Sequence, residues 1–194
     1  MAERVILGID PGTNVLGYGV LRVADGRKVE VVAMGVIDLR RCTDVYLKLG
    51  RIYERVMGII DAFLPDELAI EAPFFGKNVQ SMLKLGRAQG VTIAAAISRQ
   101  IPIAEYAPLK VKQAITGNGG ASKEQVAEMV KRVLHVNADD VAFFDATDAL
   151  AVAYCHYLQQ APCGVNLQGK GNSTKSSCNS WAQFAKQNSD RIHR

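Results

Sequence analysis

The sequence lacks an apolar run near the roughly 20 residues that a membrane-spanning helix needs, and its start does not match a signal peptide. Its four cysteines are isolated, because no two of them have the C-x-x-C spacing of a zinc site. These absences argue against a membrane protein and against a domain held together by zinc or disulfides. We therefore expect a cytoplasmic protein with reduced thiols.

A surplus of charge is also missing from most of the chain. Residues 161–194 carry five basic side chains and one acid, which accounts for the whole net charge of +4. The other 160 residues hold 18 basic groups (23 minus 5) and 18 acidic groups (19 minus 1). A nucleic-acid surface on this body must therefore come from segregation of charges rather than from an excess of basic residues.

The apolar content is sufficient for one folded domain. Hydrophobic residues make up 48% of the 194, and a domain of about 150 residues buries roughly two-thirds of the surface of its unfolded chain. After Pro162 the composition changes to Gly, Ser, Asn, Gln and Lys without periodicity. We predict a folded domain over residues 1–160 and a disordered basic tail over residues 161–194.

The spacing of apolar residues predicts an α/β fold. Runs rich in valine and isoleucine predict strands over residues 4–10, 15–24, 28–38, 67–71 and 101–105. Helical spacing predicts helices over residues 43–63 (closed by Pro65), 77–99, 108–116 and 145–159, and one that begins at the capping box from Ser122 to Gln125. Asp25-Gly26 predicts a hairpin, so the first three strands should be antiparallel. This order predicts a mixed sheet with helices on its faces.

Two acids stand at the carboxyl ends of predicted strands, which is where open α/β sheets bind ligands. Asp10 ends the first strand, and Glu71 ends the strand over residues 67–71. Each has an ordinary alternative of about equal weight. Asp10 can start the turn Asp-Pro-Gly-Thr, and Glu71 can be a solvated strand end.

Asp145 and Asp148 are three residues apart at the start of the last predicted helix, so they share one helical face. The alternative is that acids at a helix start are simply favoured by the helix dipole. Their shared face continues into Ala149 and Val152 on the core side, and two carboxylates there suggest a cation. Together with Asp10 and Glu71 they form an oxygen-rich set suited to Mg²⁺ or Mn²⁺. Two such ions can promote hydrolysis of a phosphodiester.

Asp139 and Asp140 compete for the same role. They follow His135-Val-Asn in a predicted loop, where a solvated turn is the favoured interpretation. The sequence thus favours Asp10, Glu71, Asp145 and Asp148 as the metal ligands.

Basic and aromatic residues accompany the acids. Lys110, Lys112 and Lys123 lie around the Gly-rich turn at residues 117–120, and their clustering indicates a phosphate-contacting face, although each alone would be a solvated surface lysine. The loop after Glu71 contains Phe74-Phe75-Gly-Lys77, in which an exposed aromatic can stack on a base. The alternative for these aromatics is ordinary packing within the loop.

Small residues recur along the predicted helix over residues 77–99. Gly86, Gly90 and Ala94 are spaced four apart, with Ala95 and Ala96 beside them. Such a smooth face permits close approach of another element. Two interpretations are open: packing on the helix's own sheet, and a helix-to-helix contact in a homodimer.

These motifs, taken together and in order, resemble the RuvC family of bacterial Holliday junction resolvases. The resemblance runs over nearly all of residues 4–159. It rests on four groups of segments: Ile6–Thr13 (ILGIDPGT), Ala69–Asn78 (AIEAPFFGKN) with Leu83–Gly90 (LKLGRAQG), Tyr106–Gln113 (YAPLKVKQ) with Gly117–Val126 (GNGGASKEQV), and Asp145–Val152 (DATDALAV). The first segment alone is weak, because similar loops occur in actin-like ATPases.

The resemblance implies a ribonuclease H-like fold and a homodimer in which each subunit nicks one strand of a four-way DNA junction with Mg²⁺. It implies that Asp10, Glu71, Asp145 and Asp148 are the metal ligands. Lys112 and Lys123 match the basic residues near the scissile phosphate, and Phe74 matches an aromatic that stacks into the opened junction. Some relatives carry His where this chain has Asp145. The family also works with the RuvA–RuvB branch-migration complex.

Three other functional classes compete with a junction resolvase. An actin-like ATPase would need a second phosphate loop and a longer chain. A non-catalytic module on the same fold would be expected to lose at least one of the four acids. Another ribonuclease H-like nuclease, acting on RNA or other branched DNA, is the nearest alternative.

Overall fold

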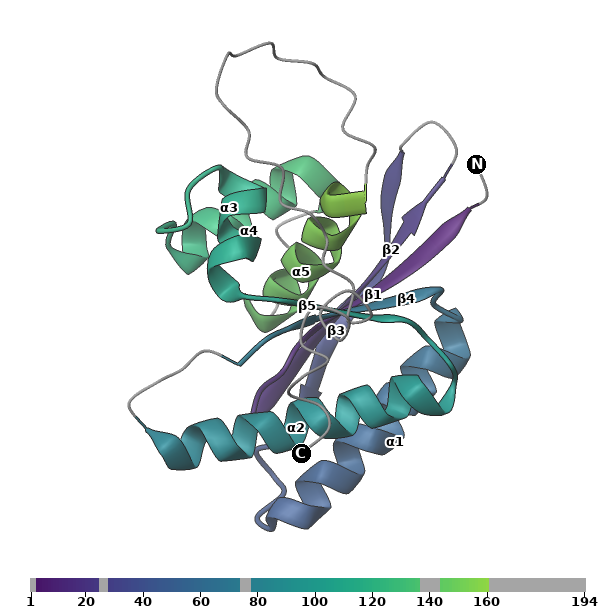
Figure 1. Cartoon of the computed structure of the whole chain (residues 1–194), viewed down its shortest axis with the longest axis vertical. Coiled ribbons are helices and arrows are strands. Elements are labelled where there is room, and N and C mark those ends of the chain that lie inside the picture. The colour runs from purple at the N-terminus through teal and green to yellow at the C-terminus, as the bar shows by residue number, and fades with distance from the viewer. Residues whose placement is uncertain (1–2, 25–27, 74–77, 137–143, 161–194) are drawn as a thin grey trace, which may run out of the picture. The chain divides into compact units, whose positions relative to one another are not determined.

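Five strands form one mixed sheet in the computed structural model, which describes residues 3–24, 28–73, 78–136 and 144–160 (Figure 1). The strands lie in the order β3-β2-β1-β4-β5. Their bounds are Arg4–Asp10 (β1), Val15–Val23 (β2), Val29–Asp38 (β3), Glu67–Glu71 (β4) and Ile103–Tyr106 (β5). β1, β2 and β3 pair in antiparallel fashion, whereas β4 pairs in parallel with β1 and β5. The predicted mixed sheet is confirmed, and the predicted Asp25-Gly26 turn lies outside the described residues.

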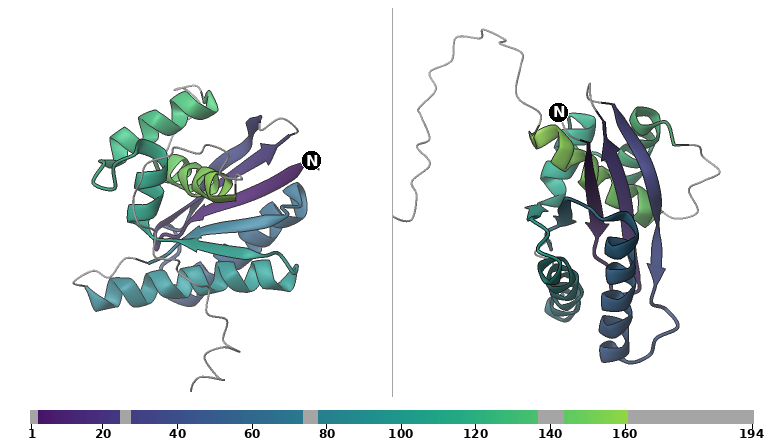
Figure 2. Two further views of the ribbon diagram at one scale, coloured as in Figure 1. Left: turned by 45° about the horizontal axis from the view of Figure 1, so that its top comes forward. Right: turned by 90° about the vertical axis from the view of Figure 1, so that its right-hand side faces the viewer.

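Helices cover both faces of this sheet, as predicted (Figure 2). The helices are α1 (Val45–Phe63), α2 (Val79–Ser98), α3 (Pro108–Thr116), α4 (Lys123–Leu134) and α5 (Phe144–Gln160). Because side chains alternate along a strand, Leu7 of β1 packs with the core of α1 and α2, and Ile6 packs with the core of α3, α4 and α5. None of the helices in the described ranges is long and apolar enough to cross a membrane.

The predicted elements are all present, with shifts at their ends. α1 begins at Val45 rather than at residue 43, because the Asp44 carboxylate caps it by accepting hydrogen bonds from the backbone N–H groups of Tyr46 and Leu47. It ends at Phe63 because Leu64 adopts a left-handed conformation, one residue before Pro65. Leu47 follows the apolar spacing of α1 but is 64% exposed, so it lies on the solvent-facing side of the helix.

The orientation of α2 decides between the two interpretations of its small residues. Ala88, Ala95 and Ala96 face the core, whereas Gly86 and Gly90 face outward with no atom within 4 Å of the place a Cβ would take. Ala94 is also exposed. Packing on the helix's own sheet is therefore the wrong interpretation for Gly86, Gly90 and Ala94. The exposed side chains of Leu83 and Ile97 make this outward face apolar.

α5 lies unusually close to the sheet, and two glycines permit it. A Cβ on Gly8 of β1 would fall 2.2 Å from the carbonyl oxygen of Ala149, and one on Gly17 of β2 would fall 1.9 Å from the carbonyl oxygen of Asp145. Glycine within a strand often marks such an approach of another backbone. The start of α5 therefore rests on strand backbone rather than on side chains.

Candidate active site

The ends of two neighbouring parallel strands bring Asp10 and Glu71 to one edge of the sheet. Ile9 of β1 lies opposite Ile70 of β4, and each is followed directly by the acid that ends its strand. Both acids are half-buried. The two strand-end acids predicted from the sequence thus lie at the same carboxyl edge, where their charges interact.

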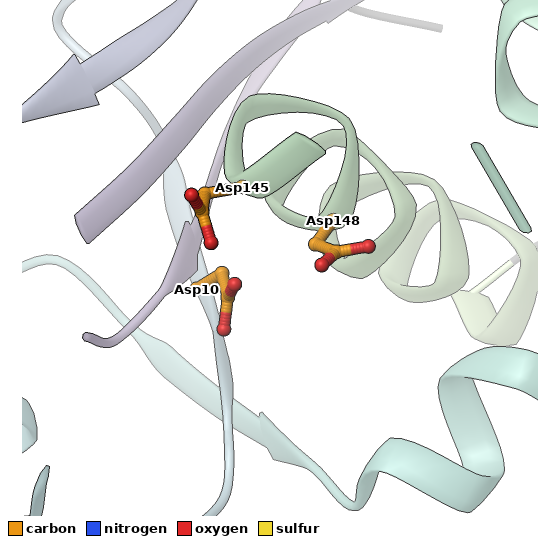
Figure 3. Close-up of side chains that lie close together, drawn as sticks. All are labelled: Asp10, Asp145 and Asp148. Carbon is orange, nitrogen blue, oxygen red and sulfur yellow. The ribbon is translucent and has the colours of Figure 1, made fainter. Parts of the chain in front are cut away.

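The start of α5 adds two more acids to this edge. Asp145 lies in the first turn of the helix, which begins at Phe144. Carboxylate oxygens of Asp10, Asp145 and Asp148 lie within 4.8 Å of one another, and Figure 3 shows the three side chains gathered between β1 and α5. Glu71 is not part of this trio, although its charge acts on Asp10. We call Asp10, Glu71, Asp145 and Asp148 the acid cluster.

Burial and mutual repulsion raise the free energy of the acid cluster when its carboxylates are ionised. Burial, followed by the neighbouring charges of Glu71 and Asp148, raises the pKa of Asp10 well above its usual range. Burial, followed by the charge of Asp148, raises the pKa of Glu71 to about 7, against the opposing effect of Lys123 and Lys112. An arrangement that crowds carboxylate oxygens at this energetic cost fits a divalent cation, which would neutralise them.

Lys123 is anchored at the acid cluster. Its Nζ donates a hydrogen bond to Asp148 Oδ2 at 2.9 Å, and this bond raises the pKa of Lys123. Lys123 is the first residue of α4, directly after Ser122, whose capping box with Gln125 is present as predicted. The local sequence therefore fixes where α4 starts and places Lys123 next to α5.

Lys112 joins Lys123 around a pocket of about 190 Å³. Glu71 and Asp148 also line this pocket, which we call the lysine pocket. Lys110, two residues away, lies elsewhere: its Nζ sits 5.2 Å from the centre of the Tyr106 ring. The structure brings together the four predicted acids and two of the three predicted lysines that it describes.

Other predicted residues lie outside the part of the chain that the structure describes. These are the loop residues Phe74, Phe75 and Lys77, the competing acids Asp139 and Asp140, and the tail over residues 161–194. Their predicted roles stay predictions, and so does the domain boundary at residue 160.

One lysine near the site was missed by the sequence reasoning. Lys48 of α1 donates hydrogen bonds from Nζ to the Thr13 carbonyl oxygen at 3.1 Å and to Asn14 Oδ1 at 2.9 Å, so it holds the loop that follows Asp10. Nothing in the sequence marks Lys48, because a single lysine on an amphipathic helix is the commonest kind of surface residue.

Comparisons with known proteins identify the family of this chain. The model of the family described as "Crossover junction endodeoxyribonuclease RuvC" matches residues 6–156. The chain belongs to the RuvC family. RuvC from Bacteroides fragilis is 61% identical over 191 residues, which cover 98% of this chain and 96% of that relative. RuvC from Porphyromonas gingivalis is 53% identical over 191 residues, with 98% and 97% covered.

A solved structure agrees with these sequence matches. The structure described as Thermus thermophilus RuvC in complex with Holliday junction substrate is 34% identical and superposes with a TM-score of 0.74, covering 80% of this chain and 94% of that one. RuvC structures have a ribonuclease H-like fold, so the predicted fold is confirmed. Members of the RuvC family are metal-dependent nucleases, and the predicted enzyme class is confirmed as well.

Proposed function

We propose that this chain resolves four-way DNA junctions in recombination and repair, by paired symmetric nicks at phosphodiester bonds. The observation that carries the proposal is the acid cluster, in which a strand end and a helix start bring three carboxylates within 4.8 Å of one another in a RuvC-family fold. The Thermus thermophilus relative, which binds a Holliday junction, aligns over 94% of its own length. A junction is therefore the substrate that this cluster is best placed to cut.

Asp10, Glu71, Asp145 and Asp148 would hold the metal. An all-oxygen donor set suits Mg²⁺, with Mn²⁺ as a substitute, and we propose two ions for each active site. Bound there, the cations supply a nucleophile at neutral pH and offset negative charge on the phosphate oxygens.

The lysines serve the chemistry through their charge. Lys123 fixes the Asp148 carboxylate by its hydrogen bond at 2.9 Å and places an ammonium group at the edge of the acid cluster. There it can offset the charge that develops on the leaving 3′ oxygen. Lys112 lines the same lysine pocket and would hold the phosphate in place. Phe74 would stack into the opened junction, with Phe75, Lys77 and Lys110 as further DNA contacts.

Paired cutting calls for two active sites, and the exposed face of α2 can supply the contact between two copies. Gly86, Gly90 and Ala94 leave this face smooth, and Leu83 and Ile97 make it apolar. Two copies related by a two-fold axis would each present one acid cluster to like strands of a near-symmetric junction. By family resemblance, the dimer would work with the RuvA–RuvB complex in the bacterial cytoplasm, where the chromosome lies.

The test offers three DNA or hybrid substrates side by side in Mg²⁺: a synthetic four-way junction, linear duplex DNA and an RNA–DNA hybrid. We expect nicks at symmetric positions in two opposing strands of the junction and no cutting of the other two substrates. Light scattering should give the mass of two chains. Cutting of the hybrid in preference to the junction would instead support the ribonuclease alternative.

A further inference from the structure

A second pocket lies beside the loop that follows Asp10, on the face of the sheet opposite Lys112 and Lys123. Its volume is about 240 Å³, and it lies between the loop after Asp10, the start of α1 and the first turns of α2. Its polar lining consists of Thr13, Asn14, Thr43, Lys48, Ser81 and Lys84. We call it the Lys48 pocket. Two lysines and three hydroxyl groups, with no carboxylate among the lining residues in the described part of the chain, are suited to an anion.

The positive charge of this pocket is not neutralised by neighbouring acids. Lys48 is half-buried and donates only to two uncharged oxygens, those of Thr13 and Asn14. Across the described ranges of the chain, neither Lys48 nor Lys84 forms an ion pair with a carboxylate. Lys123 differs, because Asp148 already partners it. Among the described residues, the two lysines of the Lys48 pocket therefore stay available to a negatively charged ligand.

The Lys48 pocket lies within reach of a DNA strand held at the acid cluster. Thr13 is three residues after Asp10, so their Cα atoms are at most about 11 Å apart. Successive phosphates of one strand are separated by at least their rise of about 3.4 Å along the duplex axis, so this distance spans at most about three nucleotides. A phosphate in the Lys48 pocket would therefore be a near neighbour of the scissile phosphate.

The two pockets lie on opposite faces of the sheet. The lysine pocket is built by α3, α4 and α5 on one face of the sheet, and the Lys48 pocket by α1 and α2 on the other. Figure 2 shows these two groups of helices on the two faces of the sheet. A strand that crosses the carboxyl edge of β1 would pass from one basic pocket to the other over the acids.

From this arrangement we propose that the Lys48 pocket binds a backbone phosphate of the cut strand, within about three nucleotides of the scissile bond. The inference rests on the proposed nuclease function and adds a second anchor to it. Phosphate contacts set the register of a nucleic acid on a protein. With one anchor on each side of the acids, the scissile bond is held at a fixed place, and a shift of about 1 Å can cost on the order of 100-fold in rate.

The first experiment measures the salt dependence of junction binding in EDTA, where no strand is cut. Each phosphate contact contributes about 0.9 to the slope of log K against log salt concentration for duplex DNA. Lys84→Gln and Lys48→Gln should each lower this slope, and the double variant should lower it by about 1 in all, because the pocket takes one phosphate. Lys48→Arg should restore the slope, because it keeps the charge.

A matched control removes the same charge from the opposite edge of the sheet. Lys28 precedes β3, near the start of β1, and pairs with Glu30. Lys28→Gln should leave the slope unchanged. If the Lys84→Gln and Lys48→Gln variants behave like Lys28→Gln, the Lys48 pocket does not bind DNA and the inference is overturned.

The second experiment finds the phosphate. Each junction carries one neutral methylphosphonate, and a series of junctions places it in turn at the three nucleotides on either side of the cut. Each junction is titrated with the wild-type chain and with the Lys48→Gln, Lys84→Gln double variant. The wild-type chain should lose affinity at one of these positions, and the double variant should show no further loss there. Equal losses for both proteins at every position would refute the inference while wild-type binding still supports the proposed function. A wild-type chain that does not bind or cut the junction refutes the proposed function itself.

Lys48 also holds the loop after Asp10, and a purely structural role must be distinguished from phosphate binding. Lys84 has no such contact with the loop, so the Lys84→Gln variant reports on phosphate binding alone. A change in slope for Lys48→Gln, without one for Lys84→Gln and without rescue by Lys48→Arg, would assign Lys48 to the loop and overturn the inference.

Discussion

Strand β4 begins and ends on a glutamate, and the two residues have opposite surroundings. Glu67, at the start, accepts a hydrogen bond from His156 Nε2 at 2.8 Å and lies 3.7 Å from the Arg4 guanidinium. The other ring nitrogen of His156 bonds to the Tyr106 hydroxyl at 2.7 Å. Glu71, at the end, has neither a hydrogen bond nor an ion pair with the residues that the structure describes, and its pKa is raised to about 7.

The difference shows how a structural acid is told from a functional one. Both glutamates are half-buried, and burial of a carboxylate is costly unless partners compensate it. The fold supplies hydrogen-bonding and ion-pair partners for Glu67. Glu71 has none among the described residues, and the charges of Lys123 and Lys112 do not offset its burial and the repulsion from Asp148. An uncompensated acid of this kind is characteristic of a functional site, because the compensating group arrives with the ligand.

The largest effect should come from neutralising the uncompensated acids. Glu71→Gln and Asp10→Asn each remove a negative charge that we assign to the metal site. We expect junction cleavage to fall by a factor of 1,000 or more, an order-of-magnitude value for loss of charge stabilisation at a reacting phosphate. Junction binding should persist. The measurement is the single-turnover nicking rate together with a gel-shift titration.

Glu67→Gln is the matched control for this experiment, because it makes the same chemical change on the same strand. Its cleavage rate should stay within a few-fold of the wild-type rate. If Glu67→Gln stops cleavage as completely as Glu71→Gln, the contrast between the two ends of β4 is wrong.

The next effect concerns Lys123, which compensates part of the acid cluster. Lys123→Gln removes the hydrogen bond to Asp148 and the charge beside the leaving oxygen. We expect cleavage to fall by about 100-fold, since loss of one charge-stabilising donor costs about 100- to 1,000-fold. Lys131→Gln, in the last turn of the same helix, should cleave normally. Equal rates for the two variants would remove Lys123 from the site.

A smaller effect should appear as a pH dependence of stability. The folded-state pKa of Glu71 lies at about 7, above its ordinary value of 4.5, so the native state holds more protons than the unfolded state between these values. Without metal, stability should therefore fall as pH rises from about 4.5 to 7, by on the order of 3 kcal/mol for this group. Mg²⁺ should raise the melting temperature more at pH 8 than at pH 5.5, because it binds the ionised acids.

Glu71→Gln provides the control for the pH experiment, since it cannot titrate. Its melting temperature in EDTA should vary less with pH than that of the wild-type chain. A metal-free wild-type protein that becomes more stable across this pH range would contradict the assignment of Glu71 as an uncompensated acid.

The smallest expected effect is at the compensated end of β4. Glu67→Ala leaves the buried His156 without one of its partners, which should cost about 1–3 kcal/mol of stability. In a domain of this size each kcal/mol lowers the melting temperature by about 2–4 °C. Calorimetry of Glu67→Ala beside Glu71→Ala measures the contrast directly: only Glu67→Ala should melt lower. A Glu71→Ala variant that melts lower still would mean that Glu71 also stabilises the fold.

Much of the fold and of the acid cluster could be predicted from the sequence because the signals are local. The capping box at Ser122, the apolar strand ahead of Asp10 and the i, i+3 spacing of Asp145 and Asp148 each lie within a few residues. The pairing of His156 with Glu67 could not be predicted, because it joins residues 89 positions apart and looks like ordinary core spacing.

The direction in which a helix face points was the other feature that could not be predicted from the sequence. The spacing of Gly86 and Gly90 marks a smooth stripe, but it does not say whether the stripe faces the sheet or the solvent. The glycines at positions 8 and 17 did carry a usable signal that was not recognised. Glycine inside an apolar strand indicates a close backbone approach, and here the approaching element is the helix that carries half of the acid cluster.

Because α5 approaches the sheet so closely, the repulsion among the acids is overcome during folding rather than during metal binding. Because α5 rests on strand backbone at Gly8 and Gly17, the helix acids and Asp10 are set at their spacing by rigid main chain rather than by adaptable side chains. The cluster is thus preorganised: folding itself gathers the charges, and an arriving cation finds them already in place. The packing of the core beneath α5 thus offsets, during folding, the free-energy cost of bringing the acids together. The metal does not have to offset that cost when it binds, so its affinity for the site is higher.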